Sequence, residues 1–332
     1  MNNPEPSAIS RKQITIKNYL CSQDQQEEVS EIIDGLSAQQ KYIPSKFFYD
    51  AIGSKLFEDI TCLPEYYPTR TEKALLKEIA PQLSKTFKNI DIVELGSGDC
   101  SKISILFDAI PFENLATVRY IPIDVSHAAI SKSAKKLVER FPDITVHGLL
   151  ADFLKHLHVI PKETERFFCF FGSTLGNLTR KQSVKFLLDL KAVMKPGDQL
   201  LIGLDMVKDI KVLENAYNDT LGITAAFNKN ILNVVNKYIK TELNPEWFEH
   251  LAYFNLSESR IEMHLRVIKD LEFSCPYMQD KIRIKSGETI HTENSHKYTH
   301  WHIFDFASIT GLKIKSVYTD INQWFSLLHL SA

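Results

Sequence analysis

Residues 90–98 read Ile90-Asp-Ile-Val-Glu-Leu-Gly-Ser-Gly98, an apolar run that ends in a glycine-serine-glycine turn. Helical periodicity follows at once, over Lys102–Ile110. A buried strand that ends in such a turn and leads into a helix is typical of an open α/β sheet, which binds its ligand at the carboxyl ends of the strands. This stretch therefore predicts an open α/β sheet.

Further apolar runs follow, and each is closed by a glycine or an acidic residue. They are Val118–Ile123, Thr145–Leu150, Phe167–Phe171 and Leu200–Leu204. Helical patterns lie before and between the runs, over Glu72–Leu83, Ala128–Phe141 and Gln182–Met194. Short apolar strands that alternate with helices predict a parallel sheet with helices on both faces.

The end of the chain completes this sheet. A helix is expected over His302–Thr310, followed by strands at Leu312–Tyr318 and Trp324–Leu330. The loop between these two strands is shorter than the roughly dozen residues that a parallel crossover needs, so we expect them to pair antiparallel. The prediction is a doubly wound, Rossmann-like sheet of seven strands with an antiparallel last pair, the pattern of a methyltransferase sheet.

Residues 208–296 interrupt the alternation. Helix-like stretches at Val212–Leu221 and Ala225–Leu243 precede strand-like runs at Arg260–Lys269 and Lys281–Lys285. We interpret 208–296 as an inserted α+β domain that binds the substrate, and 72–207 with 297–332 as the first domain. Residues 1–71 are expected to give an irregular arm up to about residue 30, a helix around Glu27–Ser37, and helices that contribute to the substrate domain.

The composition limits the classes of partner. Lys and Arg number 39 against 41 Asp and Glu, so no strong basic field indicates nucleic acid or an anionic membrane. The cysteines are scattered and form no C-x-x-C pair, which indicates reduced thiols in the cytoplasm rather than disulfides or structural zinc. The spacing of His296, His300 and His302 fits no metal motif, so we expect no metal. The start of the chain resembles no signal peptide, and no run is long and apolar enough for a membrane helix.

The strand ends predict an adenosyl cofactor. Gly96 and Gly98 allow the backbone to approach a ligand closely, but position 101 is Ser, so the third glycine of the dinucleotide fingerprint is missing. That departure disfavours NAD and favours S-adenosylmethionine, which has no pyrophosphate to bind. Asp124 can accept the ribose hydroxyls, while Asp152 and Phe153 offer an acceptor and an aromatic neighbour for adenine. Taken singly, each aspartate can equally be a cap or turn residue.

Candidate substrate residues lie elsewhere. Asn177, in the turn that begins at Gly172, can hydrogen-bond a substrate amine or carboxylate, or instead cap the following helix. Glu293 and Ser295 point the same way if their segment is extended, and together can hold a group with two nitrogens; the alternative is an exposed strand face. Tyrosines outside the sheet are possible substrate contacts, although tyrosine more often serves packing. They are Tyr49, Tyr66, Tyr67 and Tyr217.

Several motifs together resemble the histidine N-alpha-methyltransferases of ergothioneine biosynthesis. In order along the chain they are Lys46–Glu72, Val93–Gly98, Phe171–Thr179, Gly222–Asn230, Arg260–Arg266 and Thr292–Lys297. The resemblance runs from about residue 35 to the C-terminus. Members of this family transfer three methyl groups from S-adenosylmethionine to the alpha-amino group of histidine, which gives the betaine hercynine. The resemblance also implies a monomer whose partner is a small molecule, the amino acid L-histidine.

The resemblance implies roles for individual residues. The cofactor-binding residues would be Gly96, Lys102, Asp124, Asp152 and Phe153. The substrate-binding residues would be Tyr67, Gly172, Asn177, Tyr217, Met263, Glu293, Asn294 and Ser295. Of these, Glu293 and Ser295 would hold the imidazole, and Asn177 would act with Tyr49 in the catalytic step. Asn294 and His264 depart from the family pattern, where an aliphatic residue and an aromatic such as Trp are expected.

Three other interpretations compete with this one. A sister enzyme would make a betaine of tryptophan or tyrosine, but Glu293 and Met263 argue against an indole pocket. A non-catalytic protein that binds an adenosyl ligand would not need Asn177 as well as the cofactor corner. An NAD-dependent oxidoreductase is disfavoured by Ser101 and by the terminal hairpin.

Overall fold

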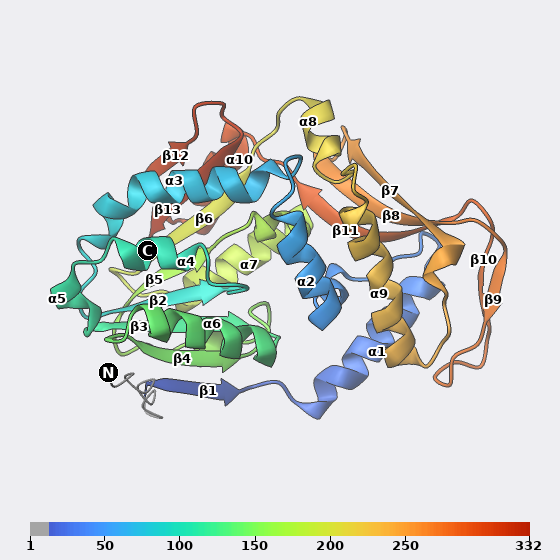
Figure 1. Ribbon diagram of the computed structural model, residues 1–332, viewed down its shortest axis with the longest axis horizontal. Coiled ribbons are helices and arrows are strands. Elements are labelled where there is room, and N and C mark those ends of the chain that lie inside the picture. The colour runs from blue at the N-terminus through green and yellow to red at the C-terminus, as the bar shows by residue number, and fades with distance from the viewer. Residues whose placement is uncertain (1–12) are drawn as a thin grey trace, which may run out of the picture.

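The computed structural model describes residues 13–332, which form two lobes, each built on its own sheet (Figure 1). The larger sheet has eight strands in the order β1-β4-β3-β2-β5-β6-β13-β12. The strands are β1 (Ile14–Asn18), β2 (Ile90–Leu95), β3 (Val118–Asp124), β4 (Thr145–Leu150), β5 (Glu165–Phe170), β6 (Gln199–Asp205), β12 (Lys313–Thr319) and β13 (Phe325–Ser331). β1 to β6 pair in parallel, whereas β13 runs antiparallel to both β6 and β12. The predicted doubly wound sheet with an antiparallel last pair is confirmed.

The sheet has one strand more than predicted. β1 pairs with β4 at the edge of the sheet, in a stretch that the sequence analysis interpreted as an irregular arm. This strand is short, and only Ile14 and Ile16 supply apolar side chains, so the sequence signal for an edge strand is weak here. Residues 1–12 of the predicted arm lie outside the described residues.

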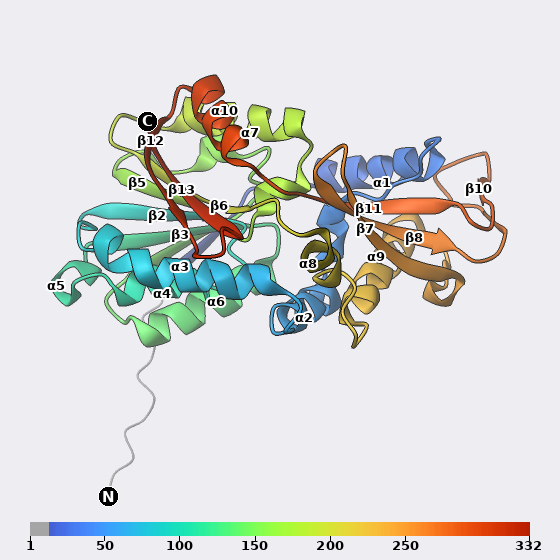
Figure 2. The same cartoon turned by 90° about the horizontal axis from the view of Figure 1, so that it is seen from above.

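Helices cover both faces of the large sheet (Figure 2). One face carries α3 (Tyr67–Ser84), α4 (Ile103–Asp108) and α6 (His127–Arg140), and the other carries α7 (Arg180–Val193) and α10 (His300–Thr310). Phe167 and Phe168 are neighbours in β5 but belong to the cores on opposite faces. Burial on both faces explains why these strands appear as unbroken apolar runs in the sequence. Two short elements, α5 (Phe112–Leu115) and η2 (Leu157–Val159), complete this lobe.

The smaller lobe contains a three-stranded antiparallel sheet in the order β11-β8-β7. Its strands are β7 (Phe248–Asn255), β8 (Arg260–Val267) and β11 (Thr289–His296), and β9 (Leu271–Phe273) pairs with β10 (Ile282–Ile284) beside them. The surrounding helices are α1 (Ser22–Ser37), η1 (Ser45–Phe48), α2 (Ala51–Ile60), α8 (Ile210–Asn215), α9 (Ile223–Ile239) and η4 (Pro245–Trp247). One apolar core joins side chains of α1, α2, α9 and this sheet. The domain boundaries given above remain a prediction.

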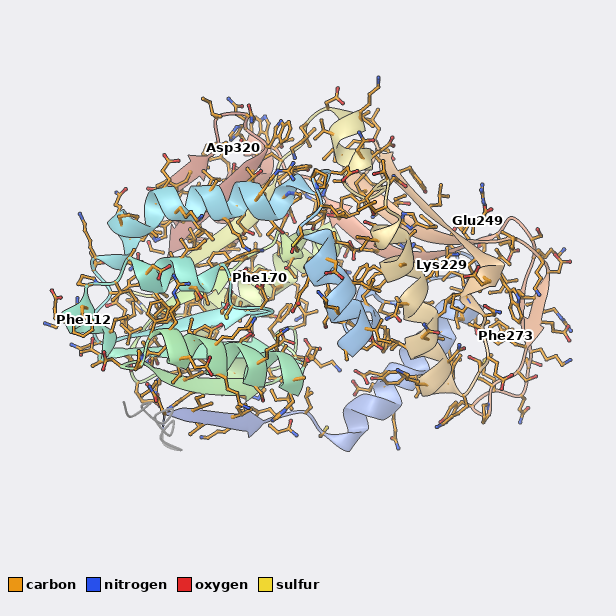
Figure 3. All side chains as sticks on the ribbon, viewed as in Figure 1. Phe112, Phe170, Lys229, Glu249, Phe273 and Asp320 are labelled. Carbon is orange, nitrogen blue, oxygen red and sulfur yellow. The ribbon has the colours of Figure 1, made fainter. Side chains whose placement is uncertain are left out.

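Side chains fill both lobes, with Phe170 inside the large one and Phe112 and Phe273 towards opposite ends of the molecule (Figure 3). Within residues 13–332, every helix is too short or too polar to span a membrane.

The start of α7 explains a residue that the sequence left ambiguous. Thr179, not Asn177, caps this helix: its hydroxyl accepts from the Gln182 N–H, and the Gln182 side chain accepts from the Thr179 N–H at 2.9 Å. Such a capping box satisfies two helix-end donors reciprocally.

We expect Thr179→Ala to lower the free energy of unfolding by about 1 kcal/mol, measured by urea denaturation. A loss below about 0.3 kcal/mol would show that this cap contributes little.

Candidate active site

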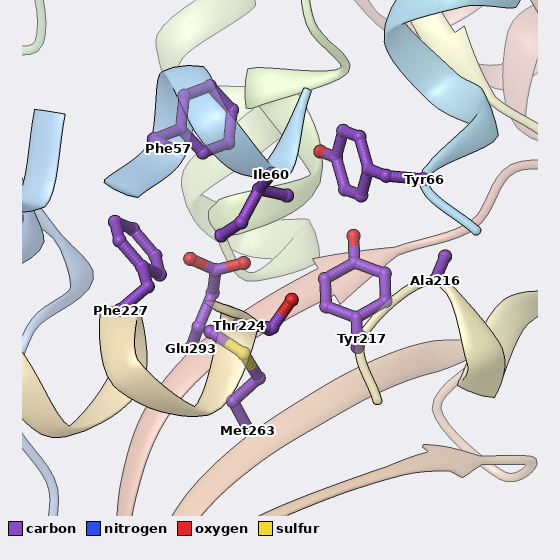
Figure 4. A pocket seen from close by; sticks show the side chains of 9 residues that line it. All are labelled: Phe57, Ile60, Tyr66, Ala216, Tyr217, Thr224, Phe227, Met263 and Glu293. Atoms are coloured by element: carbon purple, nitrogen blue, oxygen red, sulfur yellow. The ribbon is translucent and has the colours of Figure 1, made fainter. Parts of the chain in front are cut away.

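A pocket lies in the smaller lobe, among side chains that point toward one another from its helices and sheet (Figure 4). It is lined by Phe57, Ile60, Tyr66, Ala216, Tyr217, Thr224, Phe227, Met263 and Glu293. These residues come from α2, the turn before α3, the segment after α8, α9, β8 and β11. Aromatic and aliphatic side chains dominate, and among residues 13–332 Glu293 alone supplies a carboxyl to the lining. An apolar pocket with a few polar groups is the usual form of a small-molecule site.

The sheet register places the predicted ring-binding residues. Glu293 lies opposite Met263 in the pairing of β11 with β8, and Ser295 lies on the same face two residues on. Burial raises the pKa of Glu293 to about 7, and the charge of Lys297 opposes that rise. The carboxyl can therefore be ionised near neutral pH when a partner with an N–H is bound.

Tyr217 and Ser295 are joined in a buried polar network. The Tyr217 hydroxyl donates to Ser295 Oγ at 2.7 Å, and Lys297 Nζ donates to both hydroxyl oxygens, at 3.1 and 2.8 Å. Lys297 Nζ also lies 2.8 Å from Asp205 Oδ2. Although burial opposes ionisation, Lys297 and Lys208 hold the pKa of Asp205 below its ordinary value.

Tyr67 belongs to the same network but not to the pocket lining. Its hydroxyl donates to the Asp205 carboxylate at 2.8 Å and accepts from Lys208 Nζ at 2.7 Å. Its neighbour Tyr66 turns into the pocket instead. Of two adjacent tyrosines, then, one faces the pocket and the other supports Asp205 behind it.

Tyr49 packs against the pocket lining and lies close enough to Asp124, at the end of β3, for that carboxylate to affect its hydroxyl. Its ring makes edge contacts with Phe57 and Phe227, both of which line the pocket, at centroid distances of 5.8 and 6.0 Å. Enclosure by protein raises the pKa of the Tyr49 hydroxyl, and the charges of Glu293, Tyr217 and Asp124 raise it further. Because 37% of the residue is exposed, its ring can still be reached by a ligand.

The predicted cofactor residues gather where β2, β3 and β4 end. Gly96 and Gly98 both have positive φ, +69° and +51°, which favours glycine. Asp124 accepts from the N–H groups of Gly98 and Ser126, at 3.3 and 2.9 Å. A Cβ on Gly96 would lie 3.7 Å from the Phe153 ring, so these two residues are neighbours. Burial raises the pKa of Asp124.

Asp152 follows β4 at the same edge. Its carboxylate accepts from the Leu154 N–H at 2.8 Å, which fixes the side chain within its own turn. The turn role considered for this residue is thus observed. A carboxylate oxygen has more than one acceptor position, so this contact leaves capacity for a ligand amino group.

Lys102 and Gly172 are brought together by a residue that the sequence analysis did not identify. Glu72 of α3 is fully buried, and its carboxylate accepts from the Gly172 N–H at 2.9 Å and from Lys102 Nζ at 2.7 Å. A Cβ on Gly203 would come within 2.1 Å of Glu72 Oε1, so glycine is required there for this carboxylate to fit. The charge of Lys102 is therefore held by Glu72, beside the turn that ends β5.

Asn177 ends η3 (Thr174–Asn177), which packs against β11: the carbonyl of Gly176 accepts from His296 Nδ1 at 2.9 Å. The Asn177 side chain is half-buried and has no hydrogen-bond partner within residues 13–332. Asn294 lies opposite Glu262 in the register, so strand alternation directs it to the face away from Glu293 and Ser295. The two predicted ring-binding residues thus share one face of β11, and Asn294, predicted as a further substrate-binding residue, lies on the other.

Sequence reasoning missed several pocket residues, among them Phe57, Thr224 and Phe227, whereas Tyr66 was among the tyrosines considered as substrate contacts. The hydroxyl of Thr224 is buried without a partner in the described chain. Thr224 and Phe227 are three residues apart in α9, a spacing that puts two side chains on one helix face. That spacing could have indicated a shared pocket face, but only with the knowledge that α9 packs on β8.

A mostly parallel sheet with a glycine turn after β2, an acidic residue at the end of β3 and an antiparallel C-terminal pair defines the class of S-adenosylmethionine-dependent methyltransferases. Comparison with known families specifies the group within that class. The model of the histidine-specific, S-adenosylmethionine-dependent methyltransferases matches residues 28–332, and the chain belongs to this family.

Curated relatives agree with this assignment. The chain is 37% identical to the histidine N-alpha-methyltransferase of Mycolicibacterium smegmatis, over 92% of this chain and 96% of that protein. It is 38% identical to the Mycobacterium tuberculosis enzyme of the same name, over 81% and 83% of the two chains. A more distant relative is 4-dimethylallyltryptophan N-methyltransferase easF of Claviceps purpurea, with 24% identity over 81% of this chain and 84% of that one.

Proposed function

We propose that this protein transfers methyl groups from S-adenosylmethionine to the alpha-amino group of L-histidine, three times in succession, to give hercynine, the first step towards ergothioneine. The observation that carries the proposal is the placement of Glu293, Met263 and Tyr217 in the lining of one pocket. Ser295 lies behind Tyr217 and is hydrogen-bonded to its hydroxyl, and Tyr49 packs against the lining residues Phe57 and Phe227. A ring with two nitrogens suits the polar groups, and its apolar edges suit the aromatic lining.

The cofactor edge fits an adenosyl ligand. Asp124 would accept the ribose hydroxyls, Asp152 the adenine amino group, and Phe153 would pack on the adenine, while Gly96 leaves room for close approach. Lys102 would support this edge through Glu72. When bound, S-adenosylmethionine supplies a methyl group on a positively charged sulfur that a neutral amine can displace.

The chain's own residues mainly bind and orient the amino acid. Glu293 and Ser295 would fix the ring, and Tyr217 together with Tyr67 would define the carboxylate end, Tyr67 through its contact with Asp205. Asn177, whose side chain has no partner in the described part of the chain, would hold the amine in line with the methyl donor. An alpha-amine has an ordinary pKa of about 8, so a fraction is neutral near pH 7 without a dedicated base. The Tyr49 ring can accommodate the cation that grows with each methyl group.

The buried carboxyl also bears on the alternative substrates. A tryptophan or tyrosine side chain leaves either Glu293 or the Ser295 hydroxyl without a matching group, and an unpaired buried polar group costs about 1–3 kcal/mol. Histidine is therefore the amino acid that satisfies both residues.

The proposal is tested by mass spectrometry of the protein incubated with S-adenosylmethionine and each of the twenty amino acids in turn. We expect histidine alone to gain three methyl groups. Methylation of another amino acid, with histidine unmodified, would overturn the substrate assignment and leave the class intact.

Removal of the Asp124 carboxylate should weaken cofactor binding. The lost hydrogen bonds to a charged acceptor are expected to raise the dissociation constant of S-adenosylmethionine about 10- to 100-fold in Asp124→Ala, measured by calorimetry. Asp108→Ala removes an exposed carboxylate that pairs with Arg140 and serves as the control. Equal affinities for the two variants would exclude Asp124 from the cofactor site.

A further inference from the structure

Lys297 is a buried cation directly behind the proposed ring-binding residues. It follows β11 and is only 1% exposed. Its ammonium group has three N–H donors, and three acceptors surround it: Asp205 Oδ2, Ser295 Oγ and the Tyr217 hydroxyl oxygen. All three donors are therefore used within the protein, and Lys297 is left with none to offer a ligand.

The contacts of Lys297 decide what Ser295 offers. A serine oxygen has two lone pairs and one hydrogen. One lone pair accepts from Lys297 Nζ and the other from the Tyr217 hydroxyl. Tyr217 has no other hydrogen-bond acceptor for its hydroxyl within residues 13–332, so its hydrogen is directed to Ser295. What remains at Ser295 is one donor and no acceptor.

The charge around Lys297 also disfavours a cationic ligand at Ser295. Asp205 is shared by Lys208 and Lys297, so this group of three carries one net positive charge. The titratable and charged groups around Lys297 are Tyr67, Asp205, Lys208, Tyr217, Glu293 and His296. Glu293 is the nearby carboxyl that can balance the excess charge. A second cation bound at Ser295 would be repelled.

We propose that Lys297 is a specificity-determining positioning residue, which holds Ser295 as a donor so that the pocket binds a neutral imidazole in a single tautomer and excludes the imidazolium. This inference rests on the proposed function. Glu293, as an acceptor, takes the ring N–H, and Ser295 donates to the bare ring nitrogen. An imidazolium has two N–H groups and no bare nitrogen, so its second N–H would meet the filled lone pairs of Ser295.

Removal of Lys297 should allow the pocket to bind the imidazolium as well as the neutral imidazole. In Lys297→Met, the Ser295 oxygen regains a free lone pair and the adjacent positive charge is lost, so an imidazolium can donate to Ser295 and pair with Glu293. Asp205 keeps Lys208 as its counter-ion in that variant. Lys208→Met is the matched control, because it removes the other lysine from Asp205, and the hydrogen bonds of Lys208 within residues 13–332 go to Tyr67, Asp205 and Met206 instead of Ser295 or Tyr217.

The test is nitrogen NMR of ring-labelled ¹⁵N histidine bound to the protein with S-adenosylhomocysteine at pH 5.5, below the ordinary histidine pKa of about 6.5. We expect one protonated and one bare ring nitrogen in the unsubstituted protein and in Lys208→Met, and two protonated nitrogens in Lys297→Met. In parallel, the dissociation constant of histidine should rise about tenfold more per unit fall in pH in the unsubstituted protein than in Lys297→Met.

Two results would overturn the inference: two protonated nitrogens in the unsubstituted protein, or the same spectrum with and without Lys297. The first needs no variant, so it decides the matter even if Lys297→Met does not fold. Failure of the proposed function has a different signature, because histidine would then not bind the complex with S-adenosylhomocysteine even at pH 8.

Discussion

Glu293→Gln is expected to lower kcat/KM for histidine about 100-fold or more. The amide keeps the size of the side chain, but one of its ends is a donor and the other a neutral acceptor, so the charged acceptor for the ring N–H is lost. Sites that hydrogen-bond a substrate group discriminate strongly when that pairing fails. Steady-state kinetics at pH 8 would measure the effect, mainly as a higher KM.

The same substitution should stabilise the fold at alkaline pH. Burial raises the pKa of Glu293 from 4.5 to about 7, so between these values the folded protein holds a proton that the unfolded chain releases. Stability therefore falls as pH rises through that window. Because glutamine does not ionise, Glu293→Gln should gain up to about 3 kcal/mol over the unsubstituted protein at pH 8 and nothing from this source at pH 4.

Urea denaturation at the two pH values would check this. Glu249→Gln, on β7 of the same sheet, replaces an exposed carboxylate that pairs with Arg266 and is the control. A stability difference for Glu293→Gln that is the same at pH 4 and pH 8 would contradict the assigned shift. A rise in stability together with a loss of activity would identify Glu293 as a residue kept for binding at the expense of the fold.

Asp205→Asn is expected to lower the free energy of unfolding by about 3–5 kcal/mol, because it leaves Lys208 and Lys297 buried without a counter-ion. Asp205 ends β6 of the large sheet, whereas Lys297 follows β11 of the smaller sheet, so the substitution also weakens the contact between the two sheets. Urea denaturation measures the loss.

Lys208→Met tests whether the stability depends on Asp205 as the shared counter-ion or on the number of buried charges. It keeps Asp205 and Lys297 as a one-to-one pair. Burial already lowers the pKa of Lys208 to about 8, so its charge is costly in the fold. We expect Lys208→Met to lose less than half as much stability as Asp205→Asn. Similar losses for both variants would show that Asp205 is not the centre of this network.

The large sheet was predictable because its strands are covered on both faces. Phe167 and Phe168 pack on opposite sides, and so the whole run is apolar in the sequence. β11 was considered only as an extended segment at Glu293 and Ser295 and was not among the predicted strand-like runs, because its residues Thr289–His296 are mostly polar. Without an apolar pattern, only its partner β8 establishes it as a strand.

The positions of candidate residues were predictable where a general rule applies. Gly96 and Asp124 lie at the carboxyl ends of parallel strands, where open α/β sheets bind ligands, and their role there stays a prediction. No such rule separates Tyr66 from Tyr67, since the start of α3 directs one side chain to the pocket and the other to Asp205. The link between Asp205 and Lys297 joins residues far apart in the chain and exists only in the folded structure.

The most direct measurement is to locate the methyl groups on the product. The protein, S-adenosylmethionine and an equimolar mixture of the twenty amino acids are incubated together, and the products are fragmented in a mass spectrometer. We predict histidine with three methyl groups, all on the alpha nitrogen, because in the proposed site Glu293 and Ser295 would hold the ring away from the cofactor edge. Methyl groups on a ring nitrogen, or on another amino acid in preference to histidine, would contradict this account.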